Sequence, residues 1–219
     1  MDAPPDMTSL APIPPADPPL RPREAEILEA VRHVFAEKGF DGASMQELAR
    51  AAGMSVGNFY RYFPSKAAMV EELIRHDLRD VEAHFAQVLA APEPLVALRL
   101  ALSMRMRAYA EECADAPLRA EITAAALRKP ELAEVVGRVE AEITTYLVRG
   151  FAGVTGLPFD QAWARFSAHA RLIVLLVKGS TTRLRIGETD GEALTALILR
   201  QIDSLIDEVA AARPERTPR

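Results

Sequence analysis

Helix-breaking prolines and glycines divide the chain after residue 22 into segments that have the lengths of helices. The breaks fall at Gly39, Gly53, Pro64-Ser65, Pro92 to Pro94, Ala116-Pro117, Lys129-Pro130, Gly156 to Pro158 and Gly187 to Gly191. Between them, apolar residues recur at spacings of three and four, as Ile27, Val31, Val34 and Phe35 do before Gly39. No stretch of strand length alternates with a period of two. The sequence therefore predicts an all-α fold of nine helices, three short and six longer.

Composition limits where and how such a chain can act. Eight of the 16 prolines lie within residues 1–22, so we expect a disordered tail there, and a second one at residues 213–219. The N-terminal region does not resemble a signal peptide, and no apolar run is long enough for a membrane span. A single cysteine, Cys113, leaves no internal disulfide and no cysteine-based zinc site. We expect a cytoplasmic protein that carries no metal or cofactor.

The segment from Ser44 to Lys66 predicts two short helices joined by a tight turn. Ser44 followed three residues later by Glu47 forms a capping box, so a helix begins at Met45. Gly53 ends that helix after two turns, and Ser55 can cap a second helix that begins at Val56. A three-residue turn between two such helices is typical of a helix-turn-helix.

The second of these helices is unusually polar for one that packs in a core. Gly57, Asn58, Tyr60, Arg61 and Tyr62 occupy most of its surface. In a DNA major groove, the amide could read a base edge and the tyrosine hydroxyls could bind phosphates, while glycine would allow close approach. Alternatively, the tyrosines cover apolar surface and the amide is only a surface group. The net charge of −5 disfavours DNA binding over the whole surface, but residues 44–66 hold three basic groups and one acid.

The stretch from Ile27 to Leu73 resembles the N-terminal domain of TetR-type transcriptional regulators. The matching features are Phe35-Ala36-Glu37-Lys38-Gly39-Phe40, Ser44-Met45 with Leu48-Ala49, Ala52-Gly53-Met54-Ser55, and Phe59-Tyr60-Arg61-Tyr62-Phe63-Pro64-Ser65-Lys66. Asn58 departs from the small or hydroxyl residues that are common in the family at this position. The resemblance implies a DNA-binding domain at residues 23–70 and an effector-binding and dimerisation domain at residues 71–212. It also implies a homodimeric repressor that a small molecule releases from a palindromic operator.

Two sets of residues are the candidates for binding. The predicted DNA-binding residues are Ser44, Met45, Ser55, Val56, Gly57, Asn58, Tyr60, Arg61, Tyr62 and Lys66. For Lys66, which lies near the start of the next helix, a phosphate contact is expected. The predicted effector-binding residues are Met106, Tyr109, Cys113, Trp163, Phe166 and His169, which mix apolar walls with a few polar groups. For this second set, ordinary core packing is the alternative.

The last two long helices, residues 159–185 and 190–212, carry more apolar surface than one protomer needs. Their leucines and isoleucines cover arcs wider than a one-sided helix requires, which favours a two-fold four-helix dimer interface. An effector-free DNA-binding organiser that uses these helices for a protein partner is the alternative function. Enzyme activity is not expected, because the four histidines are scattered and no HExxH or GxSxG motif occurs.

Overall fold

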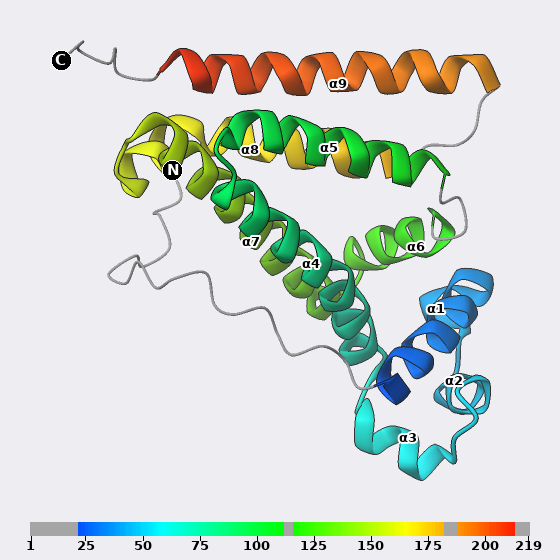
Figure 1. The fold of residues 1–219 in the computed structure, drawn as a ribbon. Coiled ribbons are helices and arrows are strands. Elements are labelled where there is room, and N and C mark those ends of the chain that lie inside the picture. Colours follow the sequence, from blue (N-terminus) through cyan, green and yellow to red (C-terminus); the bar gives the residue numbers. More distant parts are fainter. Residues whose placement is uncertain (1–21, 112–115, 182–187, 213–219) are drawn as a thin grey trace. The chain divides into compact units, whose positions relative to one another are not determined.

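The computed structural model describes residues 22–111, 116–181 and 188–212 and shows only helices among them (Figure 1). The elements are α1 (Pro22–Gly42), α2 (Met45–Ala51), α3 (Val56–Tyr62), α4 (Lys66–Ala90), α5 (Pro94–Glu111), α6 (Ala116–Ala126), α7 (Pro130–Thr155), α8 (Phe159–Thr181) and α9 (Glu188–Ala211). The all-α fold class is thus confirmed. Residues 1–21 and 213–219 of the two expected tails, and Cys113, lie outside the described residues. None of the described helices is apolar over a length that could cross a membrane.

The helices form two compact units. The helix-turn-helix unit contains α1, α2, α3 and α6, together with α4 up to Val81 and α7 up to Glu140. The C-terminal unit contains α5, α8 and α9 and the remaining parts of α4 and α7. The first unit is therefore larger than residues 23–70, because residues of α6 and of the beginning of α7 pack into its core.

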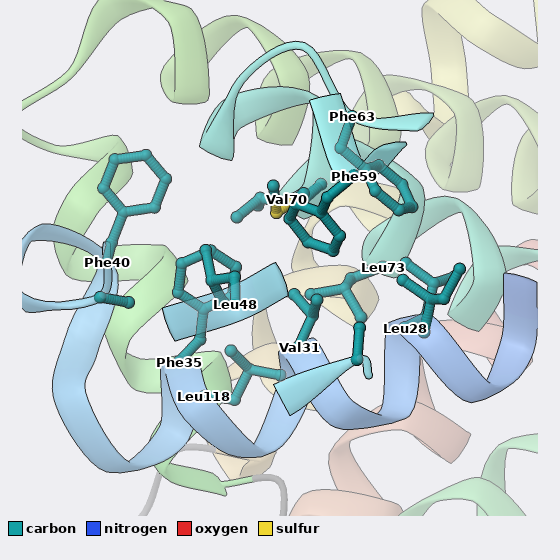
Figure 2. Close-up of a cluster of buried hydrophobic side chains, with 14 of the residues drawn as sticks. Leu28, Val31, Phe35, Phe40, Leu48, Phe59, Phe63, Val70, Leu73 and Leu118 are labelled. Atoms are coloured by element: carbon teal, nitrogen blue, oxygen red, sulfur yellow. The ribbon is translucent and has the colours of Figure 1, made fainter. Parts of the chain in front are cut away.

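One hydrophobic cluster holds the helix-turn-helix unit together (Figure 2). Phe35 of α1, Leu48 of α2 and Phe59 of α3 are almost completely buried in it, and Leu118 of α6 joins them from a segment far along the chain. The rings of Phe59 and Phe63 lie 5.7 Å apart, and the rings of Phe35 and Phe40 are stacked at 5.8 Å. Burying a large apolar side chain contributes roughly 1.5–3 kcal/mol, so this cluster fixes how the short helices sit on α1.

In the C-terminal unit, α9 runs alongside α5 and α8 (Figure 1). Its inner face contains Ile202, Ile206 and Val209, all buried. Arg99 of α5 ties the helices together, since its guanidinium donates to Asp203 at 2.9 Å and to Asp207 at 2.6 Å. Helix α8 contacts both α5 and α9, so the three helices pack together.

Candidate nucleic-acid interface

Helix α2 begins where the capping box predicted. The Ser44 hydroxyl accepts the N–H of Glu47 at 3.2 Å, and the Glu47 carboxylate accepts the backbone N–H of Ser44 at 2.9 Å. Lys38 of α1 donates to the same carboxylate at 2.6 Å. These hydrogen bonds, with that from Lys38 the largest contribution, lower the pKa of Glu47 from 4.5 to about 2. Glu47 is therefore a carboxylate at neutral pH, and Ser44 is occupied within the chain.

Helix α3 begins after Ser55, whose hydroxyl accepts the N–H of Asn58 at 3.4 Å. The turn before it contains Gly53, at φ 64°, a left-handed conformation that glycine adopts without steric cost. Arg23 of α1 braces this turn by donating to the carbonyl of Ala52 at 3.0 Å. The helix-turn-helix is thus held by contacts at both of its helix starts and at its turn.

The side chains of α3 divide sharply into one that is buried and many that are exposed. Phe59 is fully buried, whereas Tyr60 is 48% exposed and Tyr62 is 43% exposed. The other exposed residues of this helix are Val56, Gly57, Asn58 and Arg61. Among the described residues, nothing outside the backbone of α3 and the two neighbours of Gly57 lies within 4 Å of a Cβ added there, so packing in this part of the chain does not require glycine.

Lys66 has an internal role that the sequence did not reveal. Its ammonium donates to the carbonyl oxygens of Phe40 at 2.6 Å, Ala43 at 3.1 Å and Asp41 at 3.4 Å. It also lies 4.9 Å from the centroid of the Phe40 ring. An ammonium has three donors, so a phosphate contact would require Lys66 to give up one of these bonds. Met45 is likewise engaged, since it packs against the hydrophobic cluster.

The candidate effector residues do not converge on one place in the described structure. Phe166 and His169 are in contact on α8, with ring centroids 5.6 Å apart, and His169 lies 3.1 Å from Glu208 of α9. Met106 instead accepts a hydrogen bond from Ser180 at 3.2 Å. Ser180 is 14 residues beyond Phe166, about 21 Å along the helix.

The two remaining aromatic candidates for effector binding are Trp163 and Tyr109. Trp163 is partly buried and packs on Phe159, with ring centroids 5.7 Å apart. The side chain of Tyr109 lies outside the described part of the structure.

Comparison with known proteins shows what this segment resembles. Residues 27–73 match the family described as "Bacterial regulatory proteins, tetR family". The helix-turn-helix segment of this chain is thus similar to that of TetR-family regulators. The regulator UidR of Escherichia coli K12 is 26% identical over 136 residues, which are 59% of this chain and 64% of that protein. The match thus spans less than two thirds of the relative's length. UidR is described as a transcriptional regulator of the helix-turn-helix type.

Other similar proteins agree at both the sequence and the structural level. The transcriptional repressor KstR2 of Rhodococcus jostii is 34% identical over 69 residues, 32% of this chain and 34% of that one. The structure of Salmonella enterica GusR superposes with a TM-score of 0.64 at 26% identity, covering 85% of this chain and 96% of that one. The fold similarity therefore extends well beyond the helix-turn-helix.

Proposed function

We propose that this chain is a transcriptional repressor that binds a palindromic operator as a homodimer and is released by a small molecule. The observation that carries the proposal is the surface of α3, where residues exposed to solvent surround the buried Phe59. Two tyrosines and a valine exposed together on one short helix form a surface that suits a binding partner. A protein of this kind would act in the cytoplasm, where the chromosome lies.

The chemistry of the exposed α3 residues fits the DNA major groove. The Asn58 amide can form paired hydrogen bonds with an adenine edge. Tyr60 and Tyr62 can donate their hydroxyl protons to phosphate oxygens, and Arg61 can pair with a phosphate. Gly57 would let the backbone of α3 approach the bases, which accounts for a glycine that packing among the described residues does not require. Val56, at 36% exposed, offers a methyl surface to a thymine.

The remaining candidates for DNA contact have a supporting role in this proposal. Ser44 and Ser55 cap α2 and α3, and Met45 packs below them. Both serines lie at exposed positions, so a phosphate could approach these helix starts. Lys66 holds backbone carbonyls, so its main contribution is to place the start of α4 against the end of α1.

Exposed leucines on α8 and α9 support the homodimer. Leu172 and Leu175 of α8 are 41% and 63% exposed, and Leu194 and Leu197 of α9 are 45% and 46% exposed. Each pair is three residues apart and so shares one helix face. A four-helix interface with a second copy would cover all four. Two-fold symmetry then presents two α3 helices to half-sites about 34 to 36 Å apart.

The effector would bind in the C-terminal unit. Met106 and Phe166 are buried there, and Trp163 and His169 are partly exposed, so the latter two remain the better candidates for contact with a polar guest. Binding would act by favouring a dimer whose α3 helices no longer match the half-site spacing.

The proposal is tested by selecting duplexes from fragmented genomic DNA with the purified chain. We expect enrichment of an inverted repeat, bound at least a thousandfold more tightly than a random duplex of equal length. Binding of all duplexes with one affinity would contradict the proposal. Small molecules are then screened for raising the melting temperature and for releasing the selected duplex. A compound that stabilises the chain without releasing DNA would contradict the release mechanism.

A further inference from the structure

The end of α1 makes a hydrogen bond to α6, a helix that lies more than 70 residues further along the chain. Helix α1 breaks at Gly39, which has φ 73° and ψ 170°. The N–H of the next residue, Phe40, donates to the carboxylate oxygen Oε1 of Glu121 at 2.9 Å. A Cβ at residue 39 would lie 3.1 Å from that same oxygen. Glycine at this position therefore serves both the backbone turn and the approach of the carboxylate.

Glu121 is an unusual residue for its position on α6. It lies on the helix face that also carries Leu118, Ile122 and Ala125, which pack into the hydrophobic cluster. A carboxylate on such a face loses hydration and needs hydrogen-bond donors in return. Phe40 is 6% exposed, and its N–H has left the helical path, so it needs an acceptor from another segment. Each group thus satisfies the other.

Residues 39–43, here called the exit turn, are also held by cations from two directions. From the turn between α6 and α7, Lys129 binds the Asp41 carboxylate at 2.8 Å and Arg128 lies 3.7 Å from it. The hydrogen bond from Lys129 is the main reason that the pKa of Asp41 is lowered. From α4, Lys66 binds carbonyl oxygens of the exit turn. The next residue, Ser44, is the N-cap of α2.

We propose that Glu121 is a positioning residue for the DNA-binding surface. By holding the Phe40 N–H, its carboxylate sets the path of the exit turn, and the exit turn sets where α2 begins and how α3 is presented. This inference rests on the proposed function for its DNA-binding consequence. The position of α6 would then control operator affinity through one hydrogen bond, without any contact between α6 and DNA.

The test uses two substitutions in the full chain. Glu121→Leu places an apolar side chain on the packed face and removes the hydrogen-bond acceptor. Glu121→Gln keeps an acceptor oxygen and removes the charge. Glu131→Leu, at an exposed position of α7, is the control for loss of one negative charge. Removing an acidic residue should by itself strengthen DNA binding, so weaker binding by the leucine variant is not a charge effect.

Two readouts are measured: hydrogen exchange of the Phe40 amide, and affinity for the inverted repeat that the unaltered chain selects. We expect faster exchange and roughly tenfold weaker binding for Glu121→Leu, with near-normal values for Glu121→Gln and for the control. The slope of affinity against salt should stay unchanged, because no phosphate contact is lost.

Either readout can overturn the inference. A folded Glu121 variant whose Phe40 amide exchanges freely while the affinity is unchanged contradicts it, as does an unaltered exchange rate in Glu121→Leu. If Glu121→Leu does not fold, Glu121→Gln decides: weak binding with a protected amide would show that charge, and not the acceptor, matters. If the unaltered chain selects no duplex, the proposed function fails, while the exchange measurement still tests the hydrogen bond.

Discussion

Helices α2 and α3 are matched in length and in how they begin, but they differ in what they expose. Each has seven residues and follows a serine N-cap. Helix α2 buries Leu48 and Ala49. Helix α3 buries only Phe59 and leaves its valine and both tyrosines exposed to solvent. The comparison indicates that contacts within the protomer hold α2 in place, whereas the exposed face of α3 is available to a binding partner.

The largest expected effect is on the free energy of unfolding, and it distinguishes the buried side of α3 from its exposed side. Replacing Phe59 by alanine should destabilise the helix-turn-helix unit by about 3–5 kcal/mol, because a fully buried ring is lost from the cluster. The neighbouring change Tyr60→Ala should cost less than about 1 kcal/mol. Urea denaturation of both variants measures the difference. Similar losses would show that Tyr60 is a packing residue.

Removing the exposed surface that we assign to the dimer should have the next largest effect. Leu175→Glu places a charge on a side chain that is 63% exposed in the protomer, so the folded protomer should tolerate it. In the dimer the same charge would be buried without a partner and would cost several kcal/mol. Sedimentation velocity should show a monomer, while the exposed α5 variant Leu100→Glu remains a dimer. A dimeric Leu175→Glu variant would exclude this interface.

The two serine caps should differ in strength. Ser44→Ala removes both bonds of the hydroxyl, the one accepted from the Glu47 N–H at 3.2 Å and the one donated to the Glu47 carboxylate at 2.8 Å, and should cost about 1–2 kcal/mol of unfolding free energy. Ser55→Ala removes one bond at 3.4 Å and should cost about 0.5 kcal/mol. Thermal denaturation of the two variants ranks them. A reversed order would mean that α3, not α2, is the helix fixed by its cap.

The Glu47 carboxylate should make the capping box of α2 sensitive to acid. The pKa of Glu47 is depressed from 4.5 to about 2 in the folded chain, so its stabilisation is complete above pH 4.5 and disappears as pH falls towards 2. The stability difference between the unaltered chain and Glu47→Gln should therefore shrink over that range. A constant difference would contradict the assigned pairing with Lys38.

The substitution with the smallest expected effect on stability, Gly57→Ala, should have a large effect on DNA binding. Gly57→Ala removes a residue of poor helix propensity and should change unfolding free energy by at most about 1 kcal/mol in the stabilising direction. Its methyl group would nevertheless hold α3 away from the bases, so affinity for the selected duplex should fall. Denaturation and binding assays on one sample measure both. Unchanged affinity would show that the backbone at Gly57 does not approach DNA.

Sequence reasoning succeeded where one helical turn contains all the interacting groups. The capping box of Ser44 and Glu47, the cap at Ser55 and the break at Gly39 are encoded within four residues, and the structure has each of them. The bonds from Lys66 to Phe40 and from Phe40 to Glu121 join residues 26 and 81 positions apart. Helical periodicity carries no information over such distances, so the charge of Lys66 and its place near a helix start predict a phosphate contact but do not reveal its bonds within the chain.

The C-terminal unit shows the same limit more plainly. Apolar spacing predicted long helices here, and Ile202 and Ile206 of α9 are buried. The spacing could not show which candidate effector residues on different helices meet, because that depends on how α5, α8 and α9 are staggered. Met106 lies beside Ser180, while Phe166 lies beside His169 in the middle of α8.

The most direct test of α3 as the reading helix uses the inverted repeat that the unaltered chain selects. Affinities of the unaltered chain and of Asn58→Ala are measured for this duplex and for every symmetric single-base-pair variant of it. We predict that Asn58→Ala loses about 1–3 kcal/mol of discrimination at one position in each half-site and keeps it elsewhere. Unchanged discrimination at every position would contradict the assignment of Asn58 and, with it, the account of the exposed surface of α3.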